Sequence, residues 1–225
     1  MEPYRHALAD LFFPQRCVSC SKRASDLLCR DCFDAIPYIG EPFCQRCGMP
    51  TAFEAFVCED CKGVDFGFAS ARAPLRYEGV GKEIVHSLKY QGYTRVVERL
   101  MAPLMHDVVT GDFDAVVTVP LHRSRLRKRG FNQAELMSKA LAGRIKVVFS
   151  DTLEVVRKTR DQVELTASER RRNVEGAFRA RGHVRGRVLV VDDVFTTGAT
   201  LSAAASTLTR AGAAEVHALT LCRTC

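Results

Sequence analysis

One segment near the carboxyl terminus, residues 188–200, constrains the fold more than any other part of the chain. Its first four residues are all apolar, as is typical of a strand buried on both faces of a parallel sheet. Two acidic residues, Asp192 and Asp193, follow where this strand should end, and small residues then lead into an alanine-rich helix. A strand, a short loop and a helix in this order predict an α/β domain.

The same segment combines two kinds of ligand-binding group. Backbone N–H groups at the start of a helix attract phosphate, and Gly198 leaves room for a close approach. The carboxylates of Asp192 and Asp193 can accept hydrogen bonds from sugar hydroxyls. Ligands of open α/β sheets bind outside the carboxyl ends of the strands, where all these groups would lie. The combination suits a ribose 5-phosphate, although Asp and Thr also serve as ordinary helix caps.

This segment resembles the phosphoribosyl-pyrophosphate (PRPP) binding motif of type I phosphoribosyltransferases. The shared pattern is four hydrophobic residues, two acids, a hydrophobic pair and Thr-Thr-Gly-Ala-Thr. The resemblance implies that Asp192 and Asp193 hold the ribose hydroxyls of PRPP, which binds together with magnesium. It also implies that the 5-phosphate lies against the loop made of Thr196, Thr197, Gly198, Ala199 and Thr200.

Ten cysteines form five Cys-x-x-Cys pairs, and four of these pairs lie in the first third of the chain. Two thiolates separated by two residues can bind one tetrahedral Zn²⁺. Eight such ligands predict two structural zinc sites, because no ligand position is left open for catalysis. The eight are Cys17, Cys20, Cys29, Cys32, Cys44, Cys47, Cys58 and Cys61. The pairs can share metal in sequence order, or in an interleaved order that joins the first pair to the third.

Two other interpretations of the cysteines are weaker. A redox site of the thioredoxin type needs a βαβ context, which the segment lacks. An iron–sulfur cluster also accepts four cysteines, but eight in four pairs favour two zinc ions. The fifth pair, Cys222 and Cys225, has no identifiable partners and stays unassigned.

The chain divides near residue 66. Residues 1–66, rich in cysteine and proline, predict a double zinc-ribbon module that depends on metal for its stability. In residues 67–225 strand and helix patterns alternate, which predicts a parallel sheet, and the resemblance to the PRPP motif implies that this part is a phosphoribosyltransferase-like domain. The expected strands are 68–77, 115–119, 146–149, 187–191 and 215–221, and the expected helices are 80–104 (interrupted at Gly92 and Pro103), 132–142 and 201–210.

Composition indicates the kind of partner. The chain has 225 residues and a formal charge of +7, which favours anionic ligands such as phosphates, nucleotides or nucleic acid. No apolar run approaches the roughly 18 residues of a membrane span. The first residues include Glu2 and Asp10 and lack an apolar stretch, so we expect a cytoplasmic protein without membrane insertion.

Two basic segments support anion binding. The first, residues 120–130, is expected to be a loop after the strand 115–119, and a solvated charge run is the alternative. In phosphoribosyltransferases the corresponding loop holds pyrophosphate, which implies His122, Arg123 and Ser124 as the nearest candidates. The second segment includes Arg170, Arg171 and Arg172 on a short helix, which the capping-box spacing of Thr166 and Glu169 predicts. This helix suits a mobile lid or a peripheral basic surface equally well.

The complete set of motifs resembles the ComF family of phosphoribosyltransferase-like proteins. The resemblance rests on the cysteine pairs, on residues 119–134 and 159–178, and on the PRPP motif. It implies PRPP binding and the handling of single-stranded DNA during natural competence, with DNA-uptake proteins as partners. A genuine phosphoribosyltransferase that acts on a base or an amine is the alternative. The sequence leaves open whether PRPP is turned over, what the acceptor is and which oligomer forms.

Overall fold

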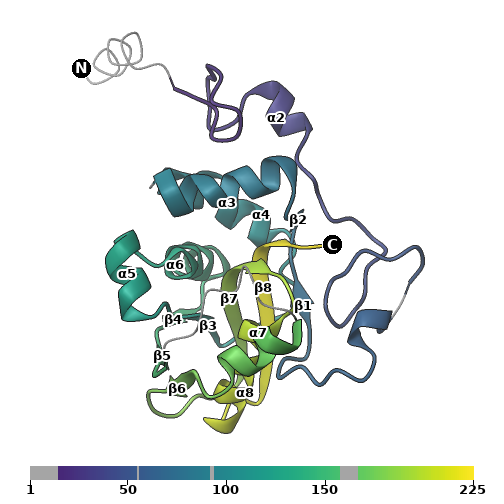
Figure 1. Cartoon of the computed structure of the whole chain (residues 1–225), viewed down its shortest axis with the longest axis vertical. Coiled ribbons are helices and arrows are strands. Elements are labelled where there is room, and N and C mark those ends of the chain that lie inside the picture. The colour runs from purple at the N-terminus through teal and green to yellow at the C-terminus, as the bar shows by residue number, and fades with distance from the viewer. Residues whose placement is uncertain (1–14, 55, 92–93, 158–166) are drawn as a thin grey trace.

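The computed structural model describes residues 15–54, 56–91, 94–157 and 167–225 (Figure 1). Its centre is a parallel sheet with the strand order β1-β8-β7-β3-β4, and β2 also pairs with β8. The prediction of an α/β fold with a parallel sheet is therefore confirmed. The strands are β1 (Ala71–Arg72), β2 (Leu75–Arg76), β3 (Ala115–Thr118), β4 (Val148–Ser150), β7 (Arg187–Phe195) and β8 (Glu215–Arg223).

Helices cover both faces of the sheet, and the strand β7 shows why. Its residues Leu189 and Val191 pack into one apolar cluster, whereas Val188 and Val190 pack into another. Successive side chains of a strand point to opposite faces, so an unbroken apolar run needs cover on both sides. The first face is covered by α3 (Gly79–Gln91), η2 (Val97–Met101), α4 (Ala102–His106) and α6 (Gln133–Ile145). The second face is covered by α8 (Ala199–Arg210), against which α7 (Ala167–Val174) packs.

Several predicted boundaries are wrong. The strand predicted at 187–191 continues through both acids to Phe195, because β8 pairs with β7 as far as Arg223. Pro103 does not interrupt a helix but lies in the first turn of α4, where a missing N–H costs nothing. The predicted loop 120–130 contains the helix α5 (Arg123–Arg129), which ends at Gly130 in the left-handed conformation.

A small antiparallel pair lies beside the main sheet and has no counterpart in the predictions. It consists of β5 (Leu153–Val155) and β6 (Phe178–Ala180). Glu154 of β5 forms ion pairs with Arg179 and Arg181, which hold the two strands together across their exposed side. The pair is too short for its alternation of side chains to stand out in the sequence.

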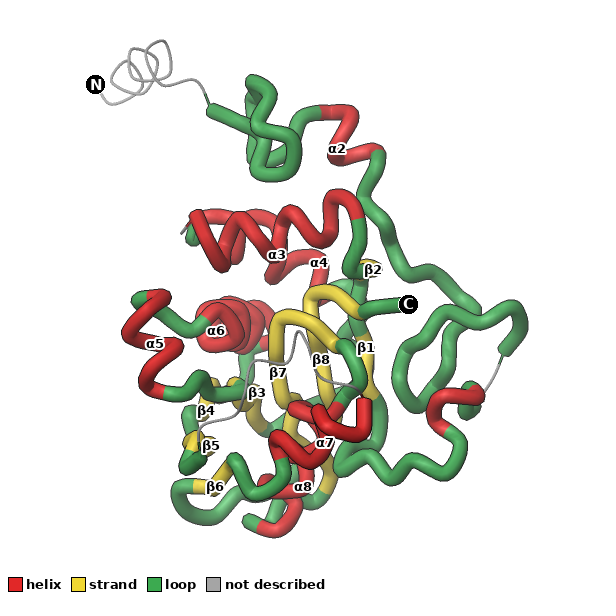
Figure 2. The backbone as a smooth tube through the Cα atoms, in the orientation of Figure 1, coloured by secondary structure: helices red, strands yellow, loops and turns green. Residues whose placement is uncertain are grey.

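The cysteine-rich part folds as two separate units, which we call the first ribbon (residues 17–32) and the second ribbon (residues 44–61). The short helix α2 (Arg30–Asp34) begins in the first ribbon, and the 3-10 turn η1 (Glu59–Cys61) closes the second. Figure 2 shows that both ribbons consist mostly of loops. Among the described residues, no helix is long and apolar enough to cross a lipid bilayer.

Candidate functional site

The two acids lie side by side at the carboxyl end of β7. Asp192 pairs in register with Thr220 of β8, and its Oδ1 accepts a hydrogen bond of 2.8 Å from the backbone N–H of Asp193. Both side chains are partly buried. On the other side of β7, the N–H of Val119 donates to the carbonyl of Val191 (3.0 Å). The segment after β3 therefore leaves the sheet next to the acids.

Lys89 joins this pair of acids, although no sequence pattern singles it out. Its Nζ lies 2.7 Å from Oδ2 of Asp193, and only 16% and 19% of the two side chains are exposed. Burial lowers the pKa of Lys89, but the charge and hydrogen bond of Asp193 outweigh it, so the pKa is raised and the ammonium stays charged. Lys89 belongs to α3, far from β7 in the sequence.

Asp192 has a different electrostatic environment from its neighbour. Burial and the charge of Asp193 raise the pKa of Asp192 to about 7, against the opposing effects of the Asp193 N–H, Lys89 and Arg129. Near neutral pH the pair thus contains one carboxylate neutralised by Lys89 and one carboxyl poised between two protonation states. Such a pair can accept hydrogen bonds from a diol.

The loop 196–200 leads from β7 into α8, and Gly198 is essential to its shape. Gly198 has φ +74°, and a Cβ there would lie 2.7 Å from the ring of Phe195 and 2.9 Å from that of Phe66. Any other residue would strain the backbone and collide with both rings. The N–H of Ala199 points toward Oγ1 of Thr197 at 3.4 Å, a weak contact at the first turn of α8. The first N–H groups of this 12-residue helix are suited to an anion.

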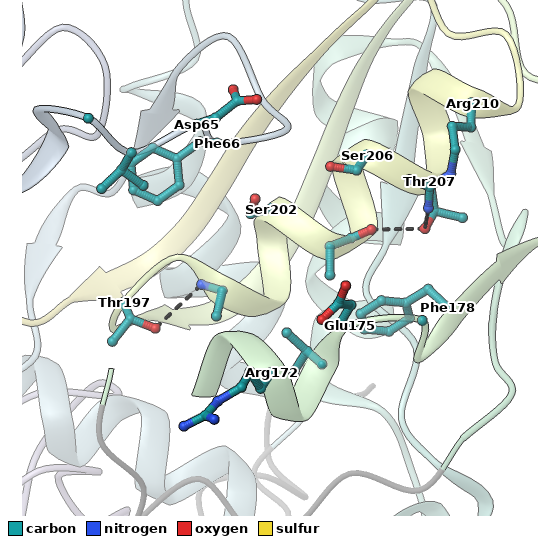
Figure 3. Close-up of a pocket in the computed structure, with 16 residues that line it drawn as sticks. Asp65, Phe66, Arg172, Glu175, Phe178, Thr197, Ser202, Ser206, Thr207 and Arg210 are labelled. Atoms are coloured by element: carbon teal, nitrogen blue, oxygen red, sulfur yellow. Dashed lines mark hydrogen bonds between the residues drawn. The ribbon is translucent and has the colours of Figure 1, made fainter. Parts of the chain in front are cut away.

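A cavity of about 430 Å³ adjoins this loop (Figure 3). It lies between α8, the segment that leaves the second ribbon at Asp65 and Phe66, and the region of α7 and β6. Arg172 and Arg210 supply positive charge to its lining, and Glu175 and Asp65 supply negative charge. The cavity is therefore polar and electrically mixed, and Thr197 connects it to the loop.

The three residues predicted to hold pyrophosphate lie at the start of α5. Nδ1 of His122 accepts a hydrogen bond of 3.2 Å from the N–H of Ser124 and lies 2.8 Å from the Ser124 hydroxyl, so His122 caps the helix. Arg123 is exposed. Their contact with pyrophosphate is untested and remains a prediction.

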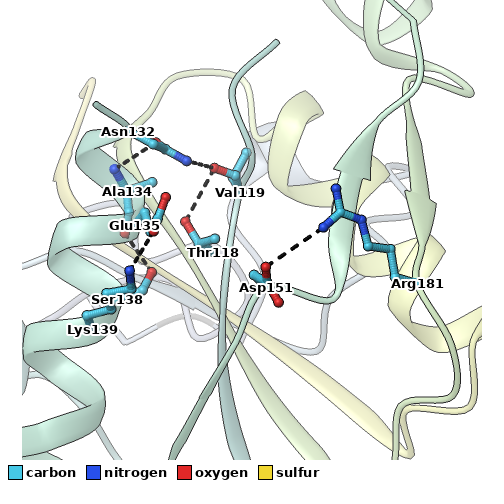
Figure 4. Close-up of polar contacts among 9 residues, drawn as sticks. All are labelled: Thr118, Val119, Asn132, Ala134, Glu135, Ser138, Lys139, Asp151 and Arg181. Carbon is cyan, nitrogen blue, oxygen red and sulfur yellow. Dashed lines mark hydrogen bonds and ion pairs between the residues drawn. The ribbon is translucent and has the colours of Figure 1, made fainter. Parts of the chain in front are cut away.

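Asn132 holds both ends of the basic segment together (Figure 4). Its Nδ2 donates to the carbonyl of Val119 (3.0 Å), while its Oδ1 accepts from the N–H of Ala134 (3.1 Å). It thus caps α6 and fixes the distance between the end of β3 and the start of α6. Asn132 therefore has a structural role in the motif 119–134 that needs no contact with a ligand.

The second basic segment is described only in part. α7 begins at Ala167, in agreement with the predicted helix, but Thr166 and the Thr159–Gln162 motif lie outside the described residues. The side chains of Arg170 and Arg171 also lie outside the described part of the chain. Arg172 is exposed and borders the cavity of Figure 3. The lid and the peripheral surface both remain open interpretations.

The eight cysteines form two compact groups in sequence order, so the interleaved arrangement is wrong. One group is Cys17, Cys20, Cys29 and Cys32, and the other is Cys44, Cys47, Cys58 and Cys61. All sulfurs of a group lie within 4.8 Å of one another. A tetrahedral zinc with Zn–S bonds of about 2.3 Å separates its sulfurs by about 3.8 Å. The Cys20–Cys29 and Cys47–Cys58 sulfurs are 3.6 and 3.7 Å apart, so both groups fit zinc without rearrangement.

One cysteine of each group lies in an environment that favours the thiolate, whereas burial raises the pKa of Cys32 and Cys61. Burial works to raise the pKa of Cys17 and Cys44, but hydrogen bonds from nearby backbone N–H groups outweigh it and lower the values to about 6 and about 7. Zn²⁺ binds the thiolate form. By contrast, Cys222 is buried and its thiol points to the carbonyl of Gly81 (3.5 Å), whereas Cys225 is exposed. The fifth pair thus lacks the arrangement of the other four.

Comparisons with known proteins agree with this geometry. The family model of the phosphoribosyl transferase domain matches residues 90–224, and that of the double zinc ribbon domain matches residues 8–62. The chain is 34% identical to the DNA utilization protein YhgH of Salmonella typhimurium over 80% of this chain and 84% of that protein. It is 28% identical to Competence protein F of Haemophilus influenzae, over 94% of this chain and 98% of that protein. It is also 28% identical to Competence protein ComFC of Streptococcus pneumoniae, over 87% of each.

Proposed function

The chain belongs to the phosphoribosyl transferase domain family, with a double zinc ribbon at its amino-terminal end, and from this premise we propose that it binds PRPP with magnesium. The site is the end of β7 and the start of α8. Asp192 and Asp193 accept hydrogen bonds from the ribose hydroxyls, and the N–H groups of the loop 196–200 hold the 5-phosphate. Magnesium prefers carboxylate and phosphate oxygens, and this site would offer both once PRPP is bound.

One observation carries this proposal: a carboxylate pair near the end of β7 is followed, after a turn of three residues (196–198), by the amino terminus of α8. The acids supply acceptors for a diol, and the left-handed Gly198 directs the chain into α8. A simple helix cap would need neither the acids nor the buried Lys89 beside them. His122, Arg123 and Ser124 are the proposed pyrophosphate contacts, because the segment after β3 starts beside Val191.

Calorimetric titration with PRPP and Mg²⁺ tests this site. The wild-type protein should bind, and the double variant D192N/D193N should lose binding while its thermal stability is retained. The single variant Asp112→Asn changes an exposed acid elsewhere and should bind like the wild type. Equal affinity in the double variant and the wild type would rule out the site.

We further propose that the protein handles single-stranded DNA during DNA uptake, in the cytoplasm. The support is the names of its relatives, which refer to DNA utilization and competence, and the basic helix α5. Five of the seven residues of α5 are Arg or Lys, and none of them is buried. Contacts between cations and phosphates would give affinity with little sequence preference. Proteins of DNA uptake are the proposed partners.

Fluorescence anisotropy with labelled oligonucleotides of several sequences tests the DNA surface. The variant R125A/R127A/K128A should bind single-stranded DNA more weakly and show a flatter dependence on salt, because fewer counterions are released. The control K62A/K82A/R185A removes the same charge at three exposed positions outside α5. If the first triple variant binds DNA like the wild type but loses PRPP, α5 serves pyrophosphate and the DNA proposal fails.

A phosphoribosyltransferase reaction is the second candidate. The observation that favours it is the cavity of about 430 Å³ beside Thr197, which has room for a second molecule. Such a transfer depends mainly on positioning and on stabilisation of developing charge. Release of pyrophosphate from PRPP in the presence of a panel of nucleobases and amines, absent in D192N/D193N, would establish turnover. No release with any acceptor would favour a binding role.

A further inference from the structure

The ion pair between Lys89 and Asp193 is unusual in its position. Its two members come from α3 and β7, and both are mostly buried at 2.7 Å. Exposed ion pairs contribute little and form readily, but a buried pair costs desolvation and needs a geometric reason. Here Asp193 of the ion pair is also one of the two acids that we assign to the ribose hydroxyls.

In each of the two acids, one carboxylate oxygen already has a partner within the protein. Lys89 occupies Oδ2 of Asp193, and the N–H of Asp193 occupies Oδ1 of Asp192. Within the described residues, no further hydrogen bond or ion pair engages the second oxygen of either carboxylate. Two adjacent carboxylates, each with one oxygen to offer, match the two adjacent hydroxyls of a ribose ring.

Lys89 also reduces the electrostatic repulsion at this site. Two neighbouring carboxylates repel each other, and together they repel a polyanionic ligand. The charged groups that act on the pair are Lys89 from α3 and Arg129 from α5, while Tyr77 and Cys222 lie close to Lys89 or Asp193. Of these, only Lys89 is in an ion pair with an acid of the site.

We propose that Lys89 is a positioning residue of the PRPP site: its ammonium fixes one oxygen of Asp193 so that both acids direct their other oxygen to the ribose hydroxyls. This inference rests on the proposed PRPP function and adds a residue outside the motif 188–200. Lys89 acts through Asp193 and needs no direct contact with the phosphates.

The variant K89M keeps the length of the side chain and removes its charge, and K89R keeps the charge. The control K82M changes an exposed lysine on the same helix. Calorimetry with PRPP and Mg²⁺ should show about 10- to 100-fold weaker binding by K89M, the range expected for a lost hydrogen bond to a charged group. K89R should recover part of the affinity, and K82M should match the wild type.

The pH profile separates positioning from a general loss of structure. Lys89 is one of the charges that lower the pKa of Asp192, so its removal raises the pKa of this acid further. The pH at which PRPP affinity is half maximal should therefore rise by roughly one unit or more in K89M relative to K82M. The ionisation of PRPP itself is common to both titrations and cancels in this comparison.

Separate probes distinguish this inference from its alternatives. Ribose 5-phosphate should lose affinity for K89M, whereas inorganic pyrophosphate should not. Equal losses for both probes would make Lys89 a phosphate ligand, and tighter binding by K89M would make the ion pair a competitor of ribose. Either result overturns the positioning role, as does an unchanged pH profile. A wild-type protein that binds no PRPP would overturn the proposed function as well.

Discussion

The two zinc ribbons have the same four-cysteine arrangement, but they contact different parts of the phosphoribosyltransferase domain. The first ribbon lies against helices: Cys17 and Leu28 share an apolar cluster with Ile84 of α3 and Met105 of α4. The second ribbon lies against the edge of the sheet and shares a cluster with Phe195 and Leu201, which flank the loop 196–200. In Figure 1 the first ribbon accordingly lies beyond α3, and the second lies beside β1.

The kinds of contact differ as well. In the second ribbon, the buried Arg223 of β8 donates to the carbonyl of Cys47, and its guanidinium lies 4.8 Å from the ring centre of Phe195. The N–H of Ala71 in β1 donates to the carbonyl of Arg46 (2.8 Å). The first ribbon has an exposed ion pair of 2.9 Å between Asp26 and Arg99 in addition to its apolar contacts.

Two metal sites with the same four-cysteine ligands can therefore differ in how strongly they support the PRPP site. Phe195 directly precedes the loop 196–200, and its ring packs against Gly198. A chain of contacts therefore leads from the second ribbon through Arg223 and Phe195 to the loop 196–200, where we propose that the 5-phosphate binds. The first ribbon instead packs on α3 and α4, and it shares no apolar cluster with Phe195 or Leu201 among the described residues.

The largest expected effect is the loss of one zinc site. Cys44→Ser and Cys17→Ser each remove one buried ligand, and structural zinc contributes on the order of 10 kcal/mol to the folding of small modules. Elemental analysis should find two zinc ions in the wild type and one in each variant. Cys44→Ser should weaken PRPP binding at least about tenfold (~1.4 kcal/mol), and Cys17→Ser should change it far less. Equal losses of PRPP affinity in the two variants would contradict the proposed difference between the ribbons.

The next effect isolates the contact chain without removing metal. Arg223→Met leaves the Cys47 carbonyl without its buried donor and removes the cation from Phe195, at a cost of about 2–4 kcal/mol in unfolding free energy. Urea denaturation measures this cost, and calorimetry should show weaker PRPP binding. Arg72→Met is the matched control, since Arg72 also bonds the second ribbon, at Gln45, but does not contact Phe195. Weaker PRPP binding by the control variant would contradict the proposed route.

The ribose end of the site predicts a pH effect of intermediate size. The pKa of Asp192 in the folded protein, about 7, exceeds the usual value near 4. Between these values the folded state holds more protons than the unfolded state, so the free energy of unfolding falls as pH rises. Asp192→Asn removes this penalty and should stabilise the protein by roughly 1–3 kcal/mol at pH 8 and very little at pH 4. Urea denaturation at both pH values checks this, and Asp112→Asn should show no such difference.

The smallest effect concerns the polar contact of the first ribbon. Asp26→Asn removes the charge opposite Arg99 but keeps the oxygen that accepts from the N–H of Leu27. Both partners are more than half exposed, so the cost should stay below about 1 kcal/mol and shrink as salt is added. Thermal denaturation at two salt concentrations measures it. A cost above about 2 kcal/mol would mean that the first ribbon depends on polar contacts as much as the second does.

The sequence predicted the parts of this molecule whose residues act locally. Residues 188–200 combine a buried strand, acids and a helix start within one short segment, so their local order already determines the arrangement. The cysteine pairs likewise predicted two metal sites. Their partition could not be predicted, because both orders of sharing satisfy the same spacing and only the fold determines which pairs meet.

The missed features depend on contacts between distant segments or on weak local signals. Lys89 is one lysine on an amphipathic helix, and nothing around it in the sequence indicates Asp193 as its partner. The sequence predicts a loop where the structure has the helix α5, because the dense charge of this segment hides the high helix propensity of Arg, Leu and Lys. The contact of Arg223 with Cys47 joins distant parts of the chain, and no sequence pattern indicates it.

A crystal structure of the protein with PRPP and Mg²⁺ tests the central claim most directly. The account predicts the 5-phosphate against the N–H groups of the loop 196–200 and the ribose hydroxyls within hydrogen-bond distance of Asp192 and Asp193, with Lys89 still on Asp193. It also predicts that Arg223 keeps Phe195 in place beneath the loop. PRPP bound elsewhere, such as on α5 alone, or a Lys89 that leaves Asp193 to bind phosphate, would contradict the account.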